Sequence, residues 1–365
     1  MVSISPPTGP VGRRRRLFGK LEPEVISDIV FRNLGAPNPA VKVGPRGGFD
    51  NAVVSIGAGK SLILTSDPVS MIPAIGMKKS AWLSLHHLVS DFTTTGLKPE
   101  FAVFDFNLPT ELSTNQLKAY FEALGDYCKE LGISIVAGHT GRYPGGGFTV
   151  VGGGVVFGVA RDGGYLNPEM ASRGDAIILT KGAAIETTAI LANSFPETVE
   201  RELGRRMLGR ARSYLSLCST VGDALEAVSG AFRGGVTSMH DATEGGVLGA
   251  LHEHAVASGR SFLVEKRRIH VSEETRGVCS IFRTDPLLSL SGGALIITCK
   301  RESVEGLIGR LRRKGIKSFE IGRVGERGRR GLWLVSNEDR AKRFTPRGRD
   351  PYWDAYEKAV ERGLK

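Results

Sequence analysis

The sequence predicts an α+β protein with two domains. Its 365 residues exceed the size of one average domain. Apolar segments with the spacing of helices and of strands alternate along both halves of the chain, and many of the 48 glycines stand in short runs between them. A turn-rich connection at 160–174 separates the halves. We therefore expect one domain over 17–160 and a second over 170–336.

The first half predicts an initial helix and then the order β-β-α-β-α-β-β. The initial helix is expected over 22–34, because a proline stands near its start and Gly35 at its end. Extended apolar runs predict the strands, and apolar residues at helical spacing predict the other helices. The strands are expected at 52–56, 62–66, 101–108, 133–137 and 149–159, and the helices at 76–95 and 115–131. This order is typical of an α+β or ferredoxin-like sheet domain.

One turn in this half imitates a nucleotide-binding motif. Gly59-Lys60-Ser61 matches the end of a P-loop, but that motif also requires a glycine at position 54, where the chain has Val54. A P-loop leads into a helix, whereas a strand is expected here. We therefore exclude a P-loop.

The second half predicts a similar mixture of strands and helices. Its strands are expected at 176–180, 263–266, 294–298, 318–324 and 331–335. Its helices are expected after Gly182, at 196–216, at 218–229, after the Gly245-Gly246 pair and at 302–314. A basic extension with several aromatic residues follows over 337–365. Two halves of similar content suggest a cleft between them, and such junctions commonly bind small ligands.

The net charge of +11 is concentrated at the two ends of the chain. Residues 1–16 carry four arginines and no acid, which predicts a disordered basic tail. Residues 301–365 hold most of the remaining excess, and the body between is close to neutral. Such ends could contact nucleic acid or acidic partners, but no RRM, KH or zinc-finger pattern accompanies them. A solvated surface is the simpler interpretation.

The chain lacks the sequence features of a membrane or secreted protein. No apolar run approaches about 18 residues, and no apolar segment follows the N-terminal arginines as in a secretory signal. The four cysteines have no C-x-x-C spacing, which argues against a zinc site or a disulfide framework. These observations predict a cytoplasmic protein.

The most informative motif runs from His240 to Gly246. Its Gly245-Gly246 pair opens an apolar helical pattern, and a helix start favours anions because its N–H groups are unpaired and its dipole end is positive. Glycine lets the backbone approach a phosphate, and Asp241 could hold the Mg²⁺ that accompanies it. The alternative is a cap residue followed by a flexible turn.

Four aspartates recur at the ends of predicted strands or helices, beside small or hydroxyl residues: Asp50, Asp67, Asp91 and Asp241. Mg²⁺ prefers hard oxygen ligands and is usually held by one or two carboxylates together with phosphate oxygens. Each aspartate alone is more often a turn or cap residue. Together with the glycine-rich loops, the four predict a site for Mg²⁺ and ATP.

Several short segments stand in a characteristic order between about residues 19 and 325. They are Gly19-Lys20-Leu21, Gly44-Pro45, Asp50-Asn51-Ala52-Val53, Leu64-Thr65-Ser66-Asp67, Val89-Ser90-Asp91, Gly138-His139-Thr140, Leu179-Thr180-Lys181-Gly182, His240 to Gly246, and Asp285-Pro286-Leu287. This ordered set resembles the AIR synthase (PurM-like) superfamily, which includes aminoimidazole ribonucleotide synthase, thiamine-monophosphate kinase, selenophosphate synthetase and HypE. The likeness is greatest to the HypE-like and archaeal AIR synthase-related members.

The resemblance implies a two-domain fold whose N-terminal sheets pair in a homodimer, with ATP in a cleft beside that interface. It also implies ATP-dependent phosphoryl transfer, which is mostly positioning and charge neutralisation. Asp50, Asp67 and Asp91 would hold Mg²⁺ and phosphates from the first domain. Asp241 would join them from the second domain, and Lys20 lies in the segment implied to cover the nucleotide. The further residues implied to bind the nucleotide are Thr140, Lys181, Glu244, Gly245 and Gly246.

Two departures from the family pattern bear on function. HypE ends in a cysteine that accepts a carbamoyl group, whereas the last cysteine here is Cys299, which argues against that thiol chemistry. The middle residue of Gly138-His139-Thr140 is usually acidic in relatives, and an imidazole is a poorer Mg²⁺ ligand than a carboxylate. His139 and Arg142 therefore either contact a phosphate or a substrate acid, or are loop residues.

We expect an ATP- and Mg²⁺-dependent enzyme that phosphorylates or dehydrates an unidentified small molecule. Its catalytic candidates are His139, Arg142 and Asp241. HypE-type hydrogenase maturation and AIR synthase activity are the alternatives within the family. The alternative of another class is a non-catalytic binding protein whose basic ends contact RNA or acidic partners, because a fold alone does not fix function.

Overall fold

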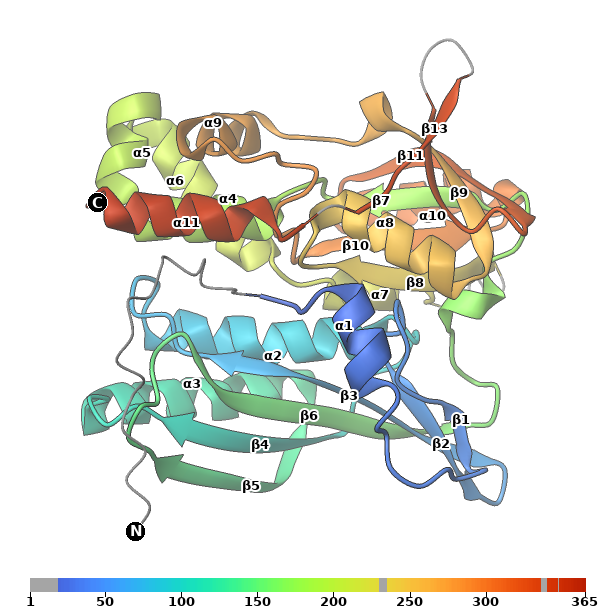
Figure 1. Ribbon diagram of the computed structural model, residues 1–365, viewed down its shortest axis with the longest axis horizontal. Helices are drawn as coiled ribbons and strands as arrows, with labels where there is room; N and C mark the ends of the chain where they lie inside the picture. The colour runs from blue at the N-terminus through green and yellow to red at the C-terminus, as the bar shows by residue number, and fades with distance from the viewer. Residues whose placement is uncertain (1–18, 230–234, 336–339, 347) are drawn as a thin grey trace.

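The computed structural model describes residues 19–229, 235–335, 340–346 and 348–365. The described residues form two α+β halves, each built on one mixed sheet, and Figure 1 shows the halves one above the other. This confirms the predicted α+β fold in two parts. The predicted basic tail at 1–16 lies outside the described residues.

The first sheet has six strands. In spatial order they are β1 (Val41–Val43), β2 (Ala52–Gly57), β3 (Lys60–Ser70), β6 (Val150–Arg161), β4 (Phe101–Leu108) and β5 (Ser134–Arg142). The β4–β5 pair is parallel, and all other neighbouring pairs are antiparallel. Two helices, α2 (Met77–Thr93) and α3 (Thr114–Leu131), pack on this sheet, and Leu88 and Phe92 of α2 join the same core as Phe104 and Val156. The edge strand β5 is exposed along almost all of its length.

The second sheet has seven strands. In spatial order they are β13 (Ala341–Arg343), β12 (Gly331–Val335), β9 (Arg260–Glu265), β11 (Ser318–Arg327), β7 (Ala176–Thr180), β10 (Ala294–Cys299) and β8 (Val236–Ala242). Strands β7 and β10 are buried at every residue, as expected where both faces of a sheet are covered. Leu251 of α8 (Gly246–Ala257) packs with Ile177 of β7, whereas Leu307 of α10 (Val304–Arg313) packs with the next residue, Ile178. Alternate residues of one strand thus serve two separate cores.

Local chemistry explains where several helices begin and end. Ser113 and Gln116 form a capping box at the start of α3, and Gly132 ends that helix with a φ of 76°. Gly204, with a φ of 82°, interrupts the helix predicted over 196–216. The structure there has α5 (Pro196–Leu203), α6 (Arg205–Ser213) and the short turn η3 (Tyr214–Leu217). The initial helix is also shorter than predicted and consists of α1 (Pro23–Val25) and η1 (Ile26–Val30).

Among the described residues, two strands and two α-helices have no counterpart among the predicted ones. They are β1, β13, α9 (Glu273–Phe282) and α11 (Pro351–Glu361). Helix α11 belongs to the predicted basic extension, yet it buries Tyr352, Ala355 and Ala359 in one core with Phe195 and Phe282. This part of the extension is therefore a packed helix. The remaining helical segments are α4 (Ile185–Ser194), α7 (Val221–Ala227), η2 (Pro168–Met170), η5 (Lys266–Arg268) and η6 (Arg301–Ser303).

The two halves meet along α2, which lies between the first sheet and the second half in Figure 1. The N–H of Thr220, just before α7, donates to Ser90 Oγ of α2 over 3.0 Å. Nearby, His86 Nδ1 of α2 lies 2.8 Å from Ser219 Oγ. These contacts hold the end of α2 against the second half. In the part of the chain that the structure describes, no helix combines the length and apolarity needed to cross a membrane.

Candidate functional site

Four aspartates converge where the two halves meet, and we call them the carboxylate cluster: Asp50, Asp67, Asp91 and Asp241. Asp50 precedes β2, Asp91 lies in the last turn of α2, and Asp241 lies near the end of β8. Asp67 was expected just after a strand at 62–66, but β3 continues to Ser70 and includes it. Two strands, a loop and a helix therefore supply the cluster.

The tightest part of the cluster joins Asp50 to the second half. His240 Nδ1 lies 2.8 Å from Asp50 Oδ2. Among the described residues, Asp50, His240 and Asp241 each offer one ligand atom, and these atoms lie within 4.8 Å of one another. His240 and Asp241 are almost completely buried. This is a compact group of oxygen and nitrogen donors of the kind that holds a metal ion.

His240 is the charged partner of two carboxylates. Its Nδ1 faces Asp50, and its Nε2 lies 3.5 Å from Glu253 Oε2 of α8. Burial opposes the charged ring, but Asp50 and Glu253 outweigh burial and raise the pKa of His240 to about 10. An imidazolium has no lone pair for a metal. In the absence of a metal, His240 therefore acts as the charged partner that orients Asp50.

The cluster carries more negative charge than its surroundings neutralise. Burial, and then the charges of the other three aspartates, raise the pKa of Asp91 well above its ordinary value. Burial and then Asp50 raise the pKa of Asp241 to about 7, against nearby cations. A divalent cation relieves such repulsion between buried carboxylates, and hard oxygen donors suit Mg²⁺. The residues present therefore fit the predicted metal.

Lys20 supplies a positive charge beside the cluster. Although the residue as a whole is exposed, its ammonium reaches Thr243 Oγ1 at 3.3 Å, and its N–H donates to Glu244 Oε2 over 2.7 Å. Burial of the ammonium opposes its charge, but Glu253 and the aspartates outweigh this and raise the pKa of Lys20. The N-terminal segment thus docks on the turn that links β8 to α8.

The glycine pair of that turn has two different structural roles. Gly245 and Gly246 have φ values of 81° and 65°, which favour glycine. A Cβ on Gly246 would lie 2.6 Å from the backbone oxygen of Leu287. The N–H of Gly245, which we expected to face a phosphate, donates to Asp350 Oδ2 over 2.8 Å. A phosphate bound at this N–H would have to displace that carboxylate.

Lys181, just after β7, is paired with residues of the second half. Its ammonium donates to the backbone oxygen of Ser219 over 2.6 Å and to Asp223 Oδ2 over 2.8 Å. Asp223 is almost completely buried in α7. The structure thus gives Lys181 a contact between β7 and α7. Its predicted contact with the nucleotide stays a prediction.

The remaining predicted residues lie together on the edge strand β5, and we call them the β5 group: His139, Thr140 and Arg142. Strands β6 and β4 separate β5 from β3, which carries Asp67. His139 Nε2 lies 2.8 Å from the hydroxyl of Tyr143, and Arg142 donates to the backbone oxygen of Leu112 over 2.6 Å. Within one chain, these residues are therefore not brought to the carboxylate cluster.

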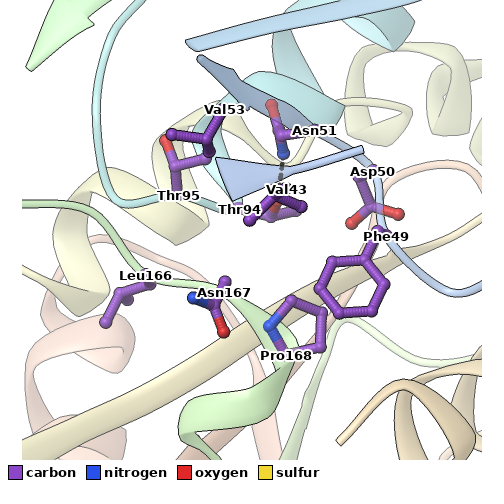
Figure 2. Close-up of a pocket in the computed structure, with 10 residues that line it drawn as sticks. All are labelled: Val43, Phe49, Asp50, Asn51, Val53, Thr94, Thr95, Leu166, Asn167 and Pro168. Atoms are coloured by element: carbon purple, nitrogen blue, oxygen red, sulfur yellow. Dashed lines mark hydrogen bonds between the residues drawn. The ribbon is translucent and has the colours of Figure 1, made fainter. Parts of the chain in front are cut away.

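A small cavity lies beside Asp50 under the loop that precedes β2. Its volume is about 10 Å³, which suits no more than one water molecule. Figure 2 shows Asn51 directed toward Thr94, to which its amide donates over 2.9 Å. The same amide donates to the backbone oxygen of Asp91 over 2.8 Å. Asn51 thus ties the strand after Asp50 to the end of α2.

A separate basic hollow of about 490 Å³ lies on the far edge of the second sheet. Arg329, Arg330, Trp333 and Arg343 line it together with Gly328. Positive charge beside an aromatic ring is the composition that nucleic acid or an acidic partner would contact. If the protein were a non-catalytic binding protein, this hollow is where RNA or an acidic partner would bind.

Several residues around the site were not predicted from the sequence. Glu253 and Asp223 lie in helices and have no local signal that separates them from solvated acids. Asp350 precedes Pro351, a pair that indicates a helix start, and the aspartate does accept the N–H of Tyr352 over 2.8 Å. That signal could have predicted α11. It could not have predicted the contact with Gly245.

Two family domains match the chain. Residues 48–160 match the AIR synthase related protein N-terminal domain, and residues 172–335 match the AIR synthase related protein C-terminal domain. The two matches lie inside the ranges predicted as domains, 17–160 and 170–336.

Individual proteins are similar over most of the chain. A carbamoyl dehydratase HypE of Cupriavidus necator is 28% identical over 298 residues, which are 78% of this chain and 79% of that protein. A solved structure of hydrogenase maturation protein HypE in complex with ATP matches with a TM-score of 0.63 and 20% identity, covering 92% of this chain and 97% of that chain. AaThiL complexed with AMPPCP and TMP matches with a TM-score of 0.65 and 16% identity, covering 90% and 100%. The two solved structures share the fold.

Proposed function

The chain belongs to the AIR synthase related protein family, and we propose that it is an ATP- and Mg²⁺-dependent enzyme that phosphorylates a small molecule or uses ATP to dehydrate one. The observation that carries this proposal is the carboxylate cluster, in which side chains from both halves meet beside Lys20. The relatives support it, since one is named a carbamoyl dehydratase and two neighbours of the same fold are complexes with ATP or AMPPCP.

In the proposed site, the four aspartates hold Mg²⁺ between the halves. Bound there, Mg²⁺ would neutralise the charge that develops on phosphate oxygens during transfer. Lys20 adds a positive charge at the same point, and its link to Glu244 holds it over the turn after β8. His240 keeps Asp50 oriented toward the second half. The chain thus supplies mainly positioning and charge, which phosphoryl transfer requires.

The proposed homodimer uses the surface around β5. Two large apolar residues of β5 are exposed, Ile135 at 48% and Val136 at 53% exposure. Apolar residues gathered on one surface commonly mark an interface. In this arrangement, the β5 group stands at the contact between subunits.

The cysteines argue against a reaction in which a thiol of this chain accepts the transferred group. All four, Cys128, Cys218, Cys279 and Cys299, are buried. Burial also raises the pKa of each thiol. A thiol that accepts a group must be accessible and ionised. We therefore favour direct transfer to a small molecule over the HypE-type alternative.

Isothermal titration with Mg-ATP tests the proposal. Asp67→Asn and Asp241→Asn each remove one oxygen charge from the cluster, and each should weaken Mg-ATP binding about 10–100-fold. Asp126→Asn, an exposed change on α3, is the matched control and should bind as the wild type does. The proposal fails if the wild type does not bind Mg-ATP, or if the two cluster variants bind it as tightly as the control.

A further inference from the structure

Glu186 is a buried carboxylate near the cluster, and the proposed site does not use it. It lies in the first turn of α4, in the second half, and its residue is 5% exposed. Its side chain accepts the backbone N–H of Gly292. Its Oε1 lies 3.4 Å from Nε2 of His87, which comes from α2 in the first half. The two halves therefore meet at this pair as they do at the cluster.

The Glu186–His87 pair adjoins the carboxylate cluster through Asp67. Burial raises the pKa of Asp67, His87 in its protonated form opposes that shift, and the charge of Glu186 adds to it. The charges that act on Asp91, by contrast, come from the other cluster members and Lys20. Asp67 is thus the neighbour that the pair and the cluster share.

One loop holds Glu186 in place relative to the turn after β8. Ser291 N–H donates to the backbone oxygen of Thr243 over 3.2 Å, and Ser291 Oγ accepts the N–H of Ala184 over 2.8 Å. The next residue, Gly292, contacts Glu186. A Cβ on Gly292 would collide with Glu186 Oε2 and lie 3.3 Å from His87 Nε2. The close approach of the three residues therefore depends on this glycine.

His87 lies beside Glu186, but its Nε2 atom is not fixed there by a hydrogen bond within the part of the chain that the structure describes. Its side chain is 22% exposed, and its Nε2 atom is buried with no hydrogen bond of good geometry from the described residues. Burial lowers the pKa of His87 although Asp67 opposes this, so the ring is neutral near pH 7. A neutral imidazole with a free nitrogen can pass on a proton or receive a substrate hydrogen bond.

We propose that Glu186 is a further catalytic residue, which takes the proton from the group that accepts the phosphoryl, while His87 positions it. This inference rests on the proposed function. In the step, the acceptor oxygen forms a bond to the terminal phosphorus, and the bond from that phosphorus to the ADP oxygen breaks. The acceptor's proton moves to the Glu186 carboxylate, and ADP leaves with the electron pair of the broken bond.

The electrostatics of Glu186 suit a base that works near neutral pH. Burial and then the charge of Glu244 raise the pKa of Glu186 to about 7, although the Gly292 hydrogen bond opposes this. A base is most effective when its pKa lies near the working pH. The ionisable groups that face it are His87 of α2, Asp67 of β3, Glu244 before α8, Cys218 before α7, Asp350 before α11 and Tyr352 of α11.

Single-turnover hydrolysis of Mg-ATP, with water as the acceptor, tests the role of Glu186. Glu186→Gln keeps an oxygen for the Gly292 N–H but cannot take a proton. It should bind Mg-ATP within about twofold of the wild type and hydrolyse it about 100-fold more slowly. The rise of the wild-type rate through about pH 7 should be absent in the variant. Glu274→Gln, at a buried glutamate of α9 paired with Arg210, is the matched control.

A second pair of variants tests the position of Glu186 without changing it. Gly292→Ala should slow hydrolysis at least about 10-fold, because its Cβ pushes the carboxylate away. Gly209→Ala in α6 has open space around its Cβ and should leave the rate unchanged. Thermal unfolding of all variants confirms that each is folded.

The outcomes separate this inference from the proposed function. Absence of Mg-ATP binding by the wild type overturns both. If Glu186→Gln binds Mg-ATP and hydrolyses it at the wild-type rate with the same pH profile, Glu186 is not the base. Should the wild type not hydrolyse ATP with water, binding of Mg-ADP with aluminium fluoride decides: loss of at least about 10-fold in Glu186→Gln supports the inference, and unchanged binding refutes it.

Discussion

The carboxylate cluster and the β5 group are predicted from the same ordered motifs, yet their surroundings differ. The cluster joins residues from both halves, and its aspartates shift the pKa values of one another. The β5 group lies on one exposed edge strand, where His139 and Arg142 contact Tyr143 and backbone oxygens nearby. A motif therefore marks a position in the fold, and the tertiary structure determines whether its charges meet.

The difference also separates two kinds of chemistry. Buried like charges are costly unless a cation compensates them, so the cluster implies a ligand. The exposed side chains of the β5 group carry no such cost: His139 contacts Tyr143, and Arg142 donates to backbone oxygens of the loop before α3. Contacts within the first half therefore account for the β5 group, whereas the cluster leaves charge that the proposed Mg²⁺ would compensate.

The largest expected effect concerns the turn beside the cluster. Gly246→Ala places a Cβ 2.6 Å from the backbone oxygen of Leu287, at a residue with a φ of 65°. We expect a loss of about 3 kcal/mol in the free energy of unfolding, measured with urea. Gly147→Ala, in the loop that follows β5, meets no atom within 4 Å and should cost little. If both variants lost the same free energy of unfolding, the turn beside the cluster would be no more tightly packed than the loop after β5.

A smaller effect is expected in the pH dependence of stability. Burial raises the pKa of Asp350 from 3.8 to about 7. The folded state then holds a proton that the unfolded state releases, so the contribution of Asp350 to stability is fully present below about pH 4 and is lost as the pH rises through about 7. Between about pH 5 and pH 8, the wild type should lose on the order of 2 kcal/mol that Asp350→Asn does not lose.

Urea unfolding at both pH values measures this difference. Asp105→Asn is the matched control, because Asp105 is exposed on β4 opposite His139 of the β5 group. It should reproduce the wild-type slope. If the free energy of unfolding of Asp350→Asn falls with pH as steeply as that of the wild type, Asp350 is not the group whose titration lowers stability.

The smallest effect is expected from the β5 group itself. His139→Ala removes a side chain that contacts Tyr143, and it should change the affinity for Mg-ATP less than about twofold. Asp91→Asn should weaken the same affinity about 10–100-fold. Calorimetric titration compares the two. A loss in His139→Ala as large as that in Asp91→Asn would place the β5 group in the nucleotide site, for example across a subunit interface.

Much of the fold could be predicted because local signals act over a few residues. Strands 101–108 and 176–180 coincide with β4 and β7, and the Ser113 cap and Gly132 bound α3 within two residues of the prediction. The break at Gly204 and the start of α11 at Asp350-Pro351 are also local signals. They were missed because apolar spacing was given more weight than glycine and cap residues.

The candidate site was predictable only in its residue types. The sequence by itself determined the four aspartates, the glycine pair and Lys20, because each belongs to a motif that a short segment defines. The tertiary structure alone decided that His240 lies between Asp50 and Glu253, that Asp350 reaches Gly245, and that Glu186 faces His87. The reason is physical: charges act through space over a few ångströms, and the residues in these pairs stand from 13 to 190 positions apart in the chain.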